Sequence, residues 1–314
     1  MKMKIKKQKI KKFEENECPA WRWILVLIVG FVIGIVISNL LGLLLAVVIT
    51  NSIGLITKTF EMQVILGLHK VVWAFLASSG CYIGTAIAIR LIAKTSLKSF
   101  VFGVGGKLNK KESLKLLGLY FVGLVLCFLI DIKTIRFSGV QFSQFLVSFL
   151  LCLIFVWMQT TWEELIFRGL VLRAVCKNDI AFNKKSFLAG LISSLVFSLL
   201  HIVNPELTSQ QTLLQKVLMA LTYFCVGLFL YISDLFGKSL MPGILIHWVN
   251  NFFLSTIIRD KVSALETSTV FIDYSSPTGF DYLVREIVFW LPVFIFYFYK
   301  MKKGTAVKNI SRRI

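Results

Sequence analysis

Eight long runs of apolar residues constrain the fold of this chain more than any other feature. They cover about residues 22–50, 66–93, 113–132, 139–176, 186–204, 211–233, 239–258 and 281–301. A helix needs about 20 mostly apolar residues to cross the hydrocarbon core of a bilayer. Within that core a helix satisfies every backbone polar group by itself. The sequence therefore predicts an all-α, polytopic transmembrane helical bundle with about eight spans.

The composition excludes the two other broad classes of protein. Of the 314 residues, 57% are hydrophobic and 16% are charged, whereas a soluble domain carries roughly 25% charged residues. The mean hydropathy is +0.78, and a disordered chain lacks apolar residues of this kind to bury. The six cysteines are scattered with no CxxC pair, so we interpret them as reduced, buried, small hydrophobic residues.

The basic residues are distributed unevenly between the two ends of the predicted spans. The net charge is +19, and seven of the 35 basic residues lie within the first twelve positions. If the N-terminus is cytoplasmic, alternating spans place 27 basic residues on that side and eight on the other. The positive-inside rule then predicts that both termini are cytoplasmic. We expect these charges to contact the lipid bilayer, and we expect no nucleic-acid partner.

The chain shows no internal repeat, no low-complexity linker and no soluble domain. We therefore expect a basic cytoplasmic tail at 1–21, a single transmembrane domain at 22–301 and a second basic tail at 302–314. The first two runs contain small residues that allow helices to pack closely, namely Gly30, Gly34, Gly42, Gly67, Gly80 and Gly84.

Three of the predicted spans carry polar or ionisable side chains. The fourth contains Glu163, Glu164 and Arg168, the fifth ends on His201, and the seventh contains the segment HWVNN at 247–251. An ionisable residue at the centre of a bilayer costs about 2.5–3.5 kcal/mol even on the lenient scale of insertion experiments. These side chains therefore need partners, a function, or both.

Helix geometry indicates which of them share a face. Glu164 and Arg168 are four residues apart with the acid first, the favourable order for an ion pair. Glu163 is rotated by about 100° from Glu164 and cannot share that face. One glutamate is then neutralised by Arg168, while the other can point into a cavity.

The same spacing occurs on the other two spans. Phe197 lies four residues before His201, so an aromatic ring can pack under the imidazole. His247 and Asn251 are also four apart and can direct two hydrogen-bond donors at one point. Structural interpretations stay open: an ion pair that only fixes packing, a histidine at the outer interface, and an interhelical hydrogen bond. For Asn250 a structural role and a place in the motif are equally open.

The three segments together resemble the motifs of a known family. EELIFR fits EExxxR, FSLLH fits FxxxH, and HWVNN fits Hxxx(N/D), in that order and on three separate spans. This set is similar to that of the CPBP intramembrane proteases, which include CAAX prenyl endopeptidases and bacteriocin-processing (Abi) proteins. Gly169 and Pro242 also match the family. The resemblance covers about residues 155–255, and it implies a helical bundle around a membrane-embedded catalytic cavity.

The resemblance also implies a role for each motif residue. Glu163 would activate water, with His201 as its partner. His247 and Asn251 would stabilise the oxyanion. The Glu164–Arg168 pair would hold the first glutamate in place, and Phe197 would support His201.

The resemblance leaves the need for a metal open. Glu163, His201 and His247 would form a His₂Glu set that suits Zn²⁺ with an open fourth position. The chain lacks HExxH, and Asn251 stands where a second ligand on the same helix would be expected. A neutral amide is a poor zinc ligand and a good oxyanion donor, so we favour metal-free catalysis with zinc as the alternative.

These observations favour an intramembrane endopeptidase that acts on a membrane-associated peptide or protein. The first alternative is a non-catalytic membrane protein, either a bacteriocin immunity factor or a scaffold for a sensor kinase. The second is a proton-coupled transporter, although the repeats and broken helix pairs typical of such proteins are missing from the sequence. We expect a multi-pass protein of a bacterial plasma membrane, with a site open to the cytoplasm and a bacteriocin, pheromone or leader peptide as substrate.

Overall fold

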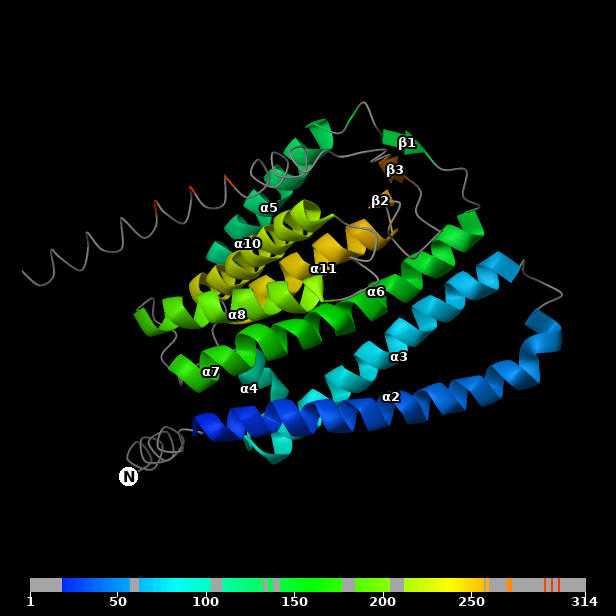
Figure 1. Ribbon diagram of the computed structural model, residues 1–314, viewed down its shortest axis with the longest axis horizontal. Coiled ribbons are helices and arrows are strands. Elements are labelled where there is room, and N and C mark those ends of the chain that lie inside the picture. The colour runs from blue at the N-terminus through cyan, green and yellow to red at the C-terminus, as the bar shows by residue number, and fades with distance from the viewer. Residues whose placement is uncertain are drawn as a thin grey trace, which may run out of the picture.

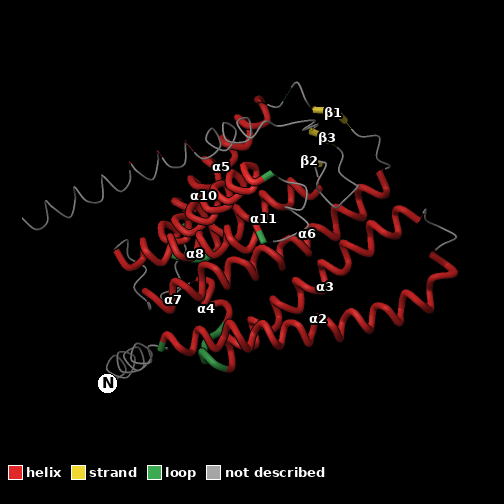
Figure 2. The backbone as a smooth tube through the Cα atoms, viewed as in Figure 1, coloured by secondary structure: helices red, strands yellow, loops and turns green. Residues whose placement is uncertain are grey.

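The computed structural model describes residues 19–56, 62–102, 109–130, 132, 135–137, 142–176, 184–203, 212–256, 258–259, 270–272, and positions 291, 295 and 299. Nearly all of these residues are helical (Figure 2). The predicted tails, the eighth apolar run and the outer loop between the seventh and eighth runs fall almost wholly outside the described residues.

Each of the first seven apolar runs coincides with a helical segment. The segments are α2 (Ala20–Ile56), α3 (Met62–Leu91), α5 (Lys110–Ile130), α6 (Phe142–Glu164) with its continuations η1 (Leu165–Leu170) and α7 (Val171–Cys176), α8 (Lys184–Ile202), α10 (Leu213–Gly237) and α11 (Met241–Thr256). A short helix, α4 (Leu97–Phe102), lies between α3 and α5.

The described helices have the composition of a membrane bundle, as predicted. Three of them, at Ala20–Leu44, Lys185–Ile202 and Leu213–Gly237, are long and apolar enough to cross a bilayer by length and composition. Large apolar side chains lie exposed along α2, among them Ile28, Phe31 and Val36. Such side chains are stable in contact with lipid and not with water. The cytoplasmic location of both termini stays a prediction.

The helices pack in a sequence that brings distant parts of the chain together. α2 packs on α3, α3 on α6, α6 on α11, and α11 on α10, which also contacts α8 and α5. Figure 1 shows α6, α8, α10 and α11 side by side in the middle of the bundle, with α2 and α3 along one flank. The three motif segments lie on α6 with η1, on α8 and on α11.

A small sheet departs from the all-helical expectation at one end of the bundle (Figure 1). β1 (Ile135–Phe137) pairs antiparallel with β3 (Val270–Ile272), with Ile135 opposite Ile272. β2 (Ile258–Arg259) pairs with the other edge of β3 in parallel. These strands belong to the connections between apolar runs, so they leave the helical core unchanged.

Glycines allow α2 and α3 to pack closely, as expected for small residues in these two runs. A Cβ added at Gly34 would come within 2.8 Å of the Cα of Cys81, and one at Gly84 within 2.8 Å of the Cα of Gly34. Gly30 and Gly80 face the partner backbone in the same way. Helices in lipid gain stability from such close van der Waals packing, because lipid and apolar side chains are equally hydrophobic.

The fourth apolar run is not one regular helix. A turn of π-helix, η1, follows Glu164 and contains Arg168. Gly169 in this turn faces α4 and the start of α11: an added Cβ would lie 2.5 Å from Cε1 of Phe100 and 2.8 Å from Cδ1 of Leu240. The Ser193 hydroxyl of α8 donates to the Phe167 carbonyl of the same turn. Isolated π-turns occur frequently at functional sites, and this one contains the charged end of the first motif.

Candidate active site

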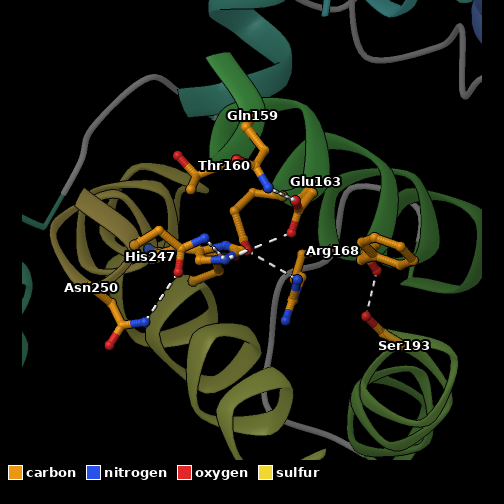
Figure 3. A network of polar contacts seen from close by, with 12 residues as sticks. Gln159, Thr160, Glu163, Arg168, Ser193, His247 and Asn250 are labelled. Atoms are coloured by element: carbon orange, nitrogen blue, oxygen red, sulfur yellow. Dashed lines mark hydrogen bonds and ion pairs between the residues drawn. The ribbon is translucent and has the colours of Figure 1, made fainter. Parts of the chain in front are cut away.

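Glu163 of the first motif and His247 of the third lie next to each other (Figure 3), and Glu164 contacts the same histidine. Glu163 and Glu164 are the last residues of α6, and Arg168 lies one turn further in η1. His247 approaches both glutamates from α11. Between 0 and 7% of each of these four residues is exposed, so they form a buried polar cluster built by α6, η1 and α11.

Glu164 is bonded through one of its two oxygens, and its Oε2 is buried with no hydrogen bond. Its Oε1 accepts a hydrogen bond from Nη1 of Arg168 at 3.0 Å and another from Nδ1 of His247 at 2.8 Å. The predicted ion pair is therefore confirmed. The second partner, His247, was not predicted, because this contact joins residues 83 positions apart on two different helices.

Glu163 keeps one oxygen without a hydrogen-bond partner. Its Oε1 accepts from Nε2 of Gln159 at 3.0 Å, while its Oε2 is buried with no hydrogen bond. That oxygen lies 3.7 Å from Nε2 of His247. Gln159 is absent from the candidates that the sequence suggested, although its position four residues before Glu163 places the two on one helix face.

The partners of His247 determine which of its nitrogens carries the proton. Oε1 of Glu164 accepts from the guanidinium of Arg168, and in the same role it accepts from Nδ1 of His247. In the neutral imidazole the other nitrogen is then an acceptor. Nε2 accepts from Nδ2 of Asn251 at 3.2 Å. The sequence suggested that His247 and Asn251 would direct two hydrogen-bond donors at one point. In the structure these two side chains bond to each other instead.

His201 is oriented by aromatic rings on both sides. Its ring lies 4.3 Å from that of Phe197, as the i, i+4 spacing predicts, and stacks on Tyr223 of α10 at 4.2 Å. Nδ1 bonds to the Phe197 carbonyl at 2.8 Å, which leaves Nε2 as the free lone pair. His201 interacts electrostatically with Glu163, but the described contacts include no hydrogen bond between them. Nothing in the sequence indicated Tyr223.

Arg168 connects the first two motifs. Its guanidinium carbon lies 4.3 Å from the centre of the Phe197 ring, in a cation–π contact. Its Nε and Nη2 are buried with no hydrogen bond. Since Phe197 also packs on His201, a shift of Arg168 would change the position of both motifs.

Asp234 is a buried acid that the sequence did not indicate, because the span predicted over 211–233 ends just before it. In the structure 1% of it is exposed, and it interacts electrostatically with Glu164 and Arg168. Its Oδ1 accepts from the backbone N–H of Gly243 at 3.0 Å. Gly243 lies one turn before His247 in α11, so Asp234 fixes the start of the helix that contains this histidine.

The first turn of α11 has no unsatisfied amide donor. Met241 N–H donates to Oγ of Ser239 at 3.1 Å, Pro242 has no N–H, and Ile244 donates to the Leu240 carbonyl at 3.0 Å. Together with the bond from Gly243 to Asp234, this accounts for the donors that the start of a helix leaves without intrahelical partners. The position of His247 is therefore set by a fully bonded helix end.

The arrangement does not match a metal site. No three His, Cys, Asp or Glu side chains in the described part of the chain are arranged to hold a metal ion. The Nδ1 atoms of His247 and His201 bond to Glu164 and to a backbone carbonyl, as those of metal-bound histidines do, but Nε2 of His247 accepts from Asn251. Glu163, His201 and His247 are therefore not gathered as a zinc set in the described part of the chain.

Comparison with known proteins points to one family. Residues 144–253 match the model of a family described as type II CAAX prenyl endopeptidase, Rce1-like. The matched segment begins in α6 and ends in α11, so it contains all three motif segments. Neither the curated proteins nor the solved structures give a significant match.

Proposed function

We propose that this chain, whose residues 144–253 match the Rce1-like family model of type II CAAX prenyl endopeptidases, hydrolyses a peptide bond of a membrane-associated peptide or protein. The observation that carries the proposal is the unpaired Oε2 of Glu163. This oxygen is buried, has no hydrogen-bond partner, and lies 3.7 Å from a histidine nitrogen. A carboxylate oxygen left free inside a polar cluster is available to bind and deprotonate water.

In the proposed reaction Glu163 takes a proton from water as the water oxygen attacks the scissile carbonyl. The negative charge moves to the carbonyl oxygen, and the leaving nitrogen must gain a proton as its bond to carbon breaks. His201 keeps Nε2 as a lone pair near Glu163, so it can share this proton transfer. Gln159 holds the other oxygen of Glu163 and fixes the orientation of the carboxylate.

Asn251 is better suited than His247 to donate a hydrogen bond to the oxyanion. Its Nδ2 has two N–H bonds and uses one of them on His247. His247 would need a second proton before its Nε2 could donate, because Nδ1 holds the proton that faces Glu164. A donor aimed at the developing oxyanion acts in the transition state and is worth about 10²–10³ in kcat.

We further propose a multi-pass protein of a bacterial plasma membrane with a non-prenylated substrate, such as a bacteriocin, pheromone or leader peptide. The short predicted loops and the Lys- and Ile-rich composition support this setting. The family description names CAAX prenyl substrates, so the substrate test needs a prenylated and an unprenylated peptide of the same sequence. Faster cleavage of the prenylated peptide would assign the family's named substrate class to this chain.

The test of catalysis is cleavage of candidate peptides in proteoliposomes by Glu163→Gln, which keeps the shape and removes the base. We expect kcat to fall by about 10²–10⁴, the usual contribution of a general base. Glu112→Gln is the matched control, because Glu112 lies in the first turn of α5 and pairs with the exposed Lys115, not with the polar cluster. It should keep kcat within about twofold of the parent, because it takes no part in that cluster.

The same variant separates an enzyme from a scaffold. Undiminished cleavage by Glu163→Gln, His201→Ala and His247→Ala would end the assignment as a protease of this mechanism. If Glu163→Gln abolishes cleavage yet fully complements a deletion strain, the physiological role is that of a non-catalytic immunity factor or scaffold.

A further inference from the structure

A chain of hydrogen bonds leads from the candidate site to a helix outside the family match. Nδ2 of Asn250 donates to Oδ1 of Asn251 at 3.1 Å, and the hydroxyl of Tyr120 donates to Oδ1 of Asn250 at 2.9 Å. Tyr120 lies on α5, 24 residues before the matched segment begins. We infer that Tyr120 and Asn250 are positioning residues that turn the amide of Asn251 so that its N–H bonds face the reaction; this inference rests on the proposed function.

In this series of hydrogen bonds, the donor and acceptor of each bond follow from those of the bond before it. Oε1 of Glu164 pairs with Arg168 and accepts, so Nδ1 of His247 donates and Nε2 accepts. Asn251 must then present Nδ2 to His247, which turns its Oδ1 the other way. That oxygen needs a donor and finds Nδ2 of Asn250.

The orientation of Asn250 leaves its own oxygen in need of a donor. Oδ1 of Asn250 faces α5 and accepts a hydrogen bond from the Tyr120 hydroxyl, which completes the series. A phenol can donate a hydrogen bond where a phenylalanine ring cannot. With the hydroxyl present, one set of amide orientations makes every hydrogen bond in the series from Nδ1 of His247 to Oδ1 of Asn250.

Tyr120 is held firmly enough to act in this way. It is 1% exposed and packs in a cluster with Leu116 of α5, Phe229 and Leu230 of α10, and Ile246 of α11. Ile246 directly precedes His247, so the ring is anchored to the helix that contains the third motif. α5 contacts both α10 and α11. The hydroxyl therefore reaches Asn250 from a rigid position.

Removal of the hydroxyl has a specific consequence for catalysis. The oxygen of Asn250 loses its donor, and the amide can flip to bring Nδ2 toward α5. Its oxygen would then face Oδ1 of Asn251, and repulsion between the two acceptors would favour a flip of Asn251 as well. A flipped Asn251 presents an oxygen where the oxyanion needs N–H. The expected defect lies in the transition state and not in substrate binding.

The experiment compares Tyr120→Phe with Tyr231→Phe in the same proteoliposome cleavage assay. Tyr231 is equally buried and its hydroxyl donates to the Ser186 carbonyl, so it controls for the loss of a buried hydroxyl. We expect Tyr120→Phe to lower kcat about tenfold with KM within about twofold, since a tenfold change is the scale of one net hydrogen bond. Tyr231→Phe should leave kcat within about twofold, whatever its effect on melting temperature.

A double variant tests whether Tyr120 acts through Asn250. In an Asn250→Ala background, which lacks the connecting amide, adding Tyr120→Phe should lower kcat by less than about twofold, because effects on one network are not additive. A further tenfold loss in that background would overturn the inference, as would an unchanged kcat for Tyr120→Phe alone. The kcat of each variant is taken per mole of folded protein, so partial misfolding does not imitate the effect.

Glu163→Gln in the same assay separates this inference from the proposed function. If Glu163→Gln is inactive and Tyr120→Phe is as active as the parent, the mechanism stands and the positioning role is wrong. If Glu163→Gln is fully active, the proposed function is wrong, and the positioning role is wrong with it.

Discussion

Replacement of Arg168 by Met should destabilise the protein by about 3–5 kcal/mol, the usual cost of breaking a buried ion pair by removing one partner. Arg168 and Glu164 are both 0% exposed, and Nη1 lies 3.0 Å from Oε1. The substitution leaves the Glu164 carboxylate buried with only His247 as a partner. Methionine keeps much of the apolar contact with Phe197 and offers its own sulfur–aromatic contact, so the lost charge accounts for most of the effect.

The double variant Arg168→Met/Glu164→Gln shows whether the unpaired charge is the cause. Glutamine keeps a carbonyl oxygen that can accept from Nδ1 of His247, and no charge remains in the pair. We expect the double variant to lose about 1–2 kcal/mol, less than Arg168→Met alone, because replacing both partners of a buried pair is often close to neutral.

The measurement is the free energy of unfolding in mixed micelles by denaturing-detergent titration, followed by the fluorescence of the seven tryptophans. Glu164→Gln alone closes the thermodynamic cycle and gives the coupling energy of the pair. A loss below about 1 kcal/mol for Arg168→Met, or a double variant no more stable than that single one, would refute the reasoning that a stranded buried charge dominates.

Two further predictions follow from the same geometry. Asp234→Ala should lower the unfolding free energy by about 1–3 kcal/mol, because it leaves the N–H of Gly243 without an acceptor at the start of α11. Asp234→Asn keeps an acceptor at this position and should recover at least half of that loss. Equal losses for the two variants would contradict the role of the hydrogen bond. Because Asn251 stands where a second ligand on the same helix would be expected and bonds to Nε2 of His247, we expect purified protein to keep its cleavage activity after exhaustive chelation. Activity lost to a chelator and restored by Zn²⁺ alone, with stoichiometric zinc in the active protein, would make His247 a ligand.

The sequence predicted the features that depend on local composition and helical spacing. Apolar run length located the first seven helical segments, because the thickness of a bilayer sets the length of a span. The spacing of four residues predicted the pair of Glu164 with Arg168 and the contact of Phe197 with His201, because residues four apart share a helix face. The glycines of α2 and α3 predicted a close helix pair for a similar local reason.

The contacts between helices could not be derived in this way. His247 bonds to Glu164, Tyr223 stacks on His201, and the hydroxyl of Tyr120 reaches Asn250, each across two helices. Which helices meet, and at what rotation, is weakly encoded in an apolar sequence, because lipid solvates any apolar face as well as a neighbouring helix does. The π-turn at η1 follows from the same cause, since Gly169 has to fit against Phe100 and Leu240 from other segments. The sequence alone thus determined which residues could form a site within the membrane, and only the packing of the helices decided which of them touch, because those contacts depend on helix tilt and rotation.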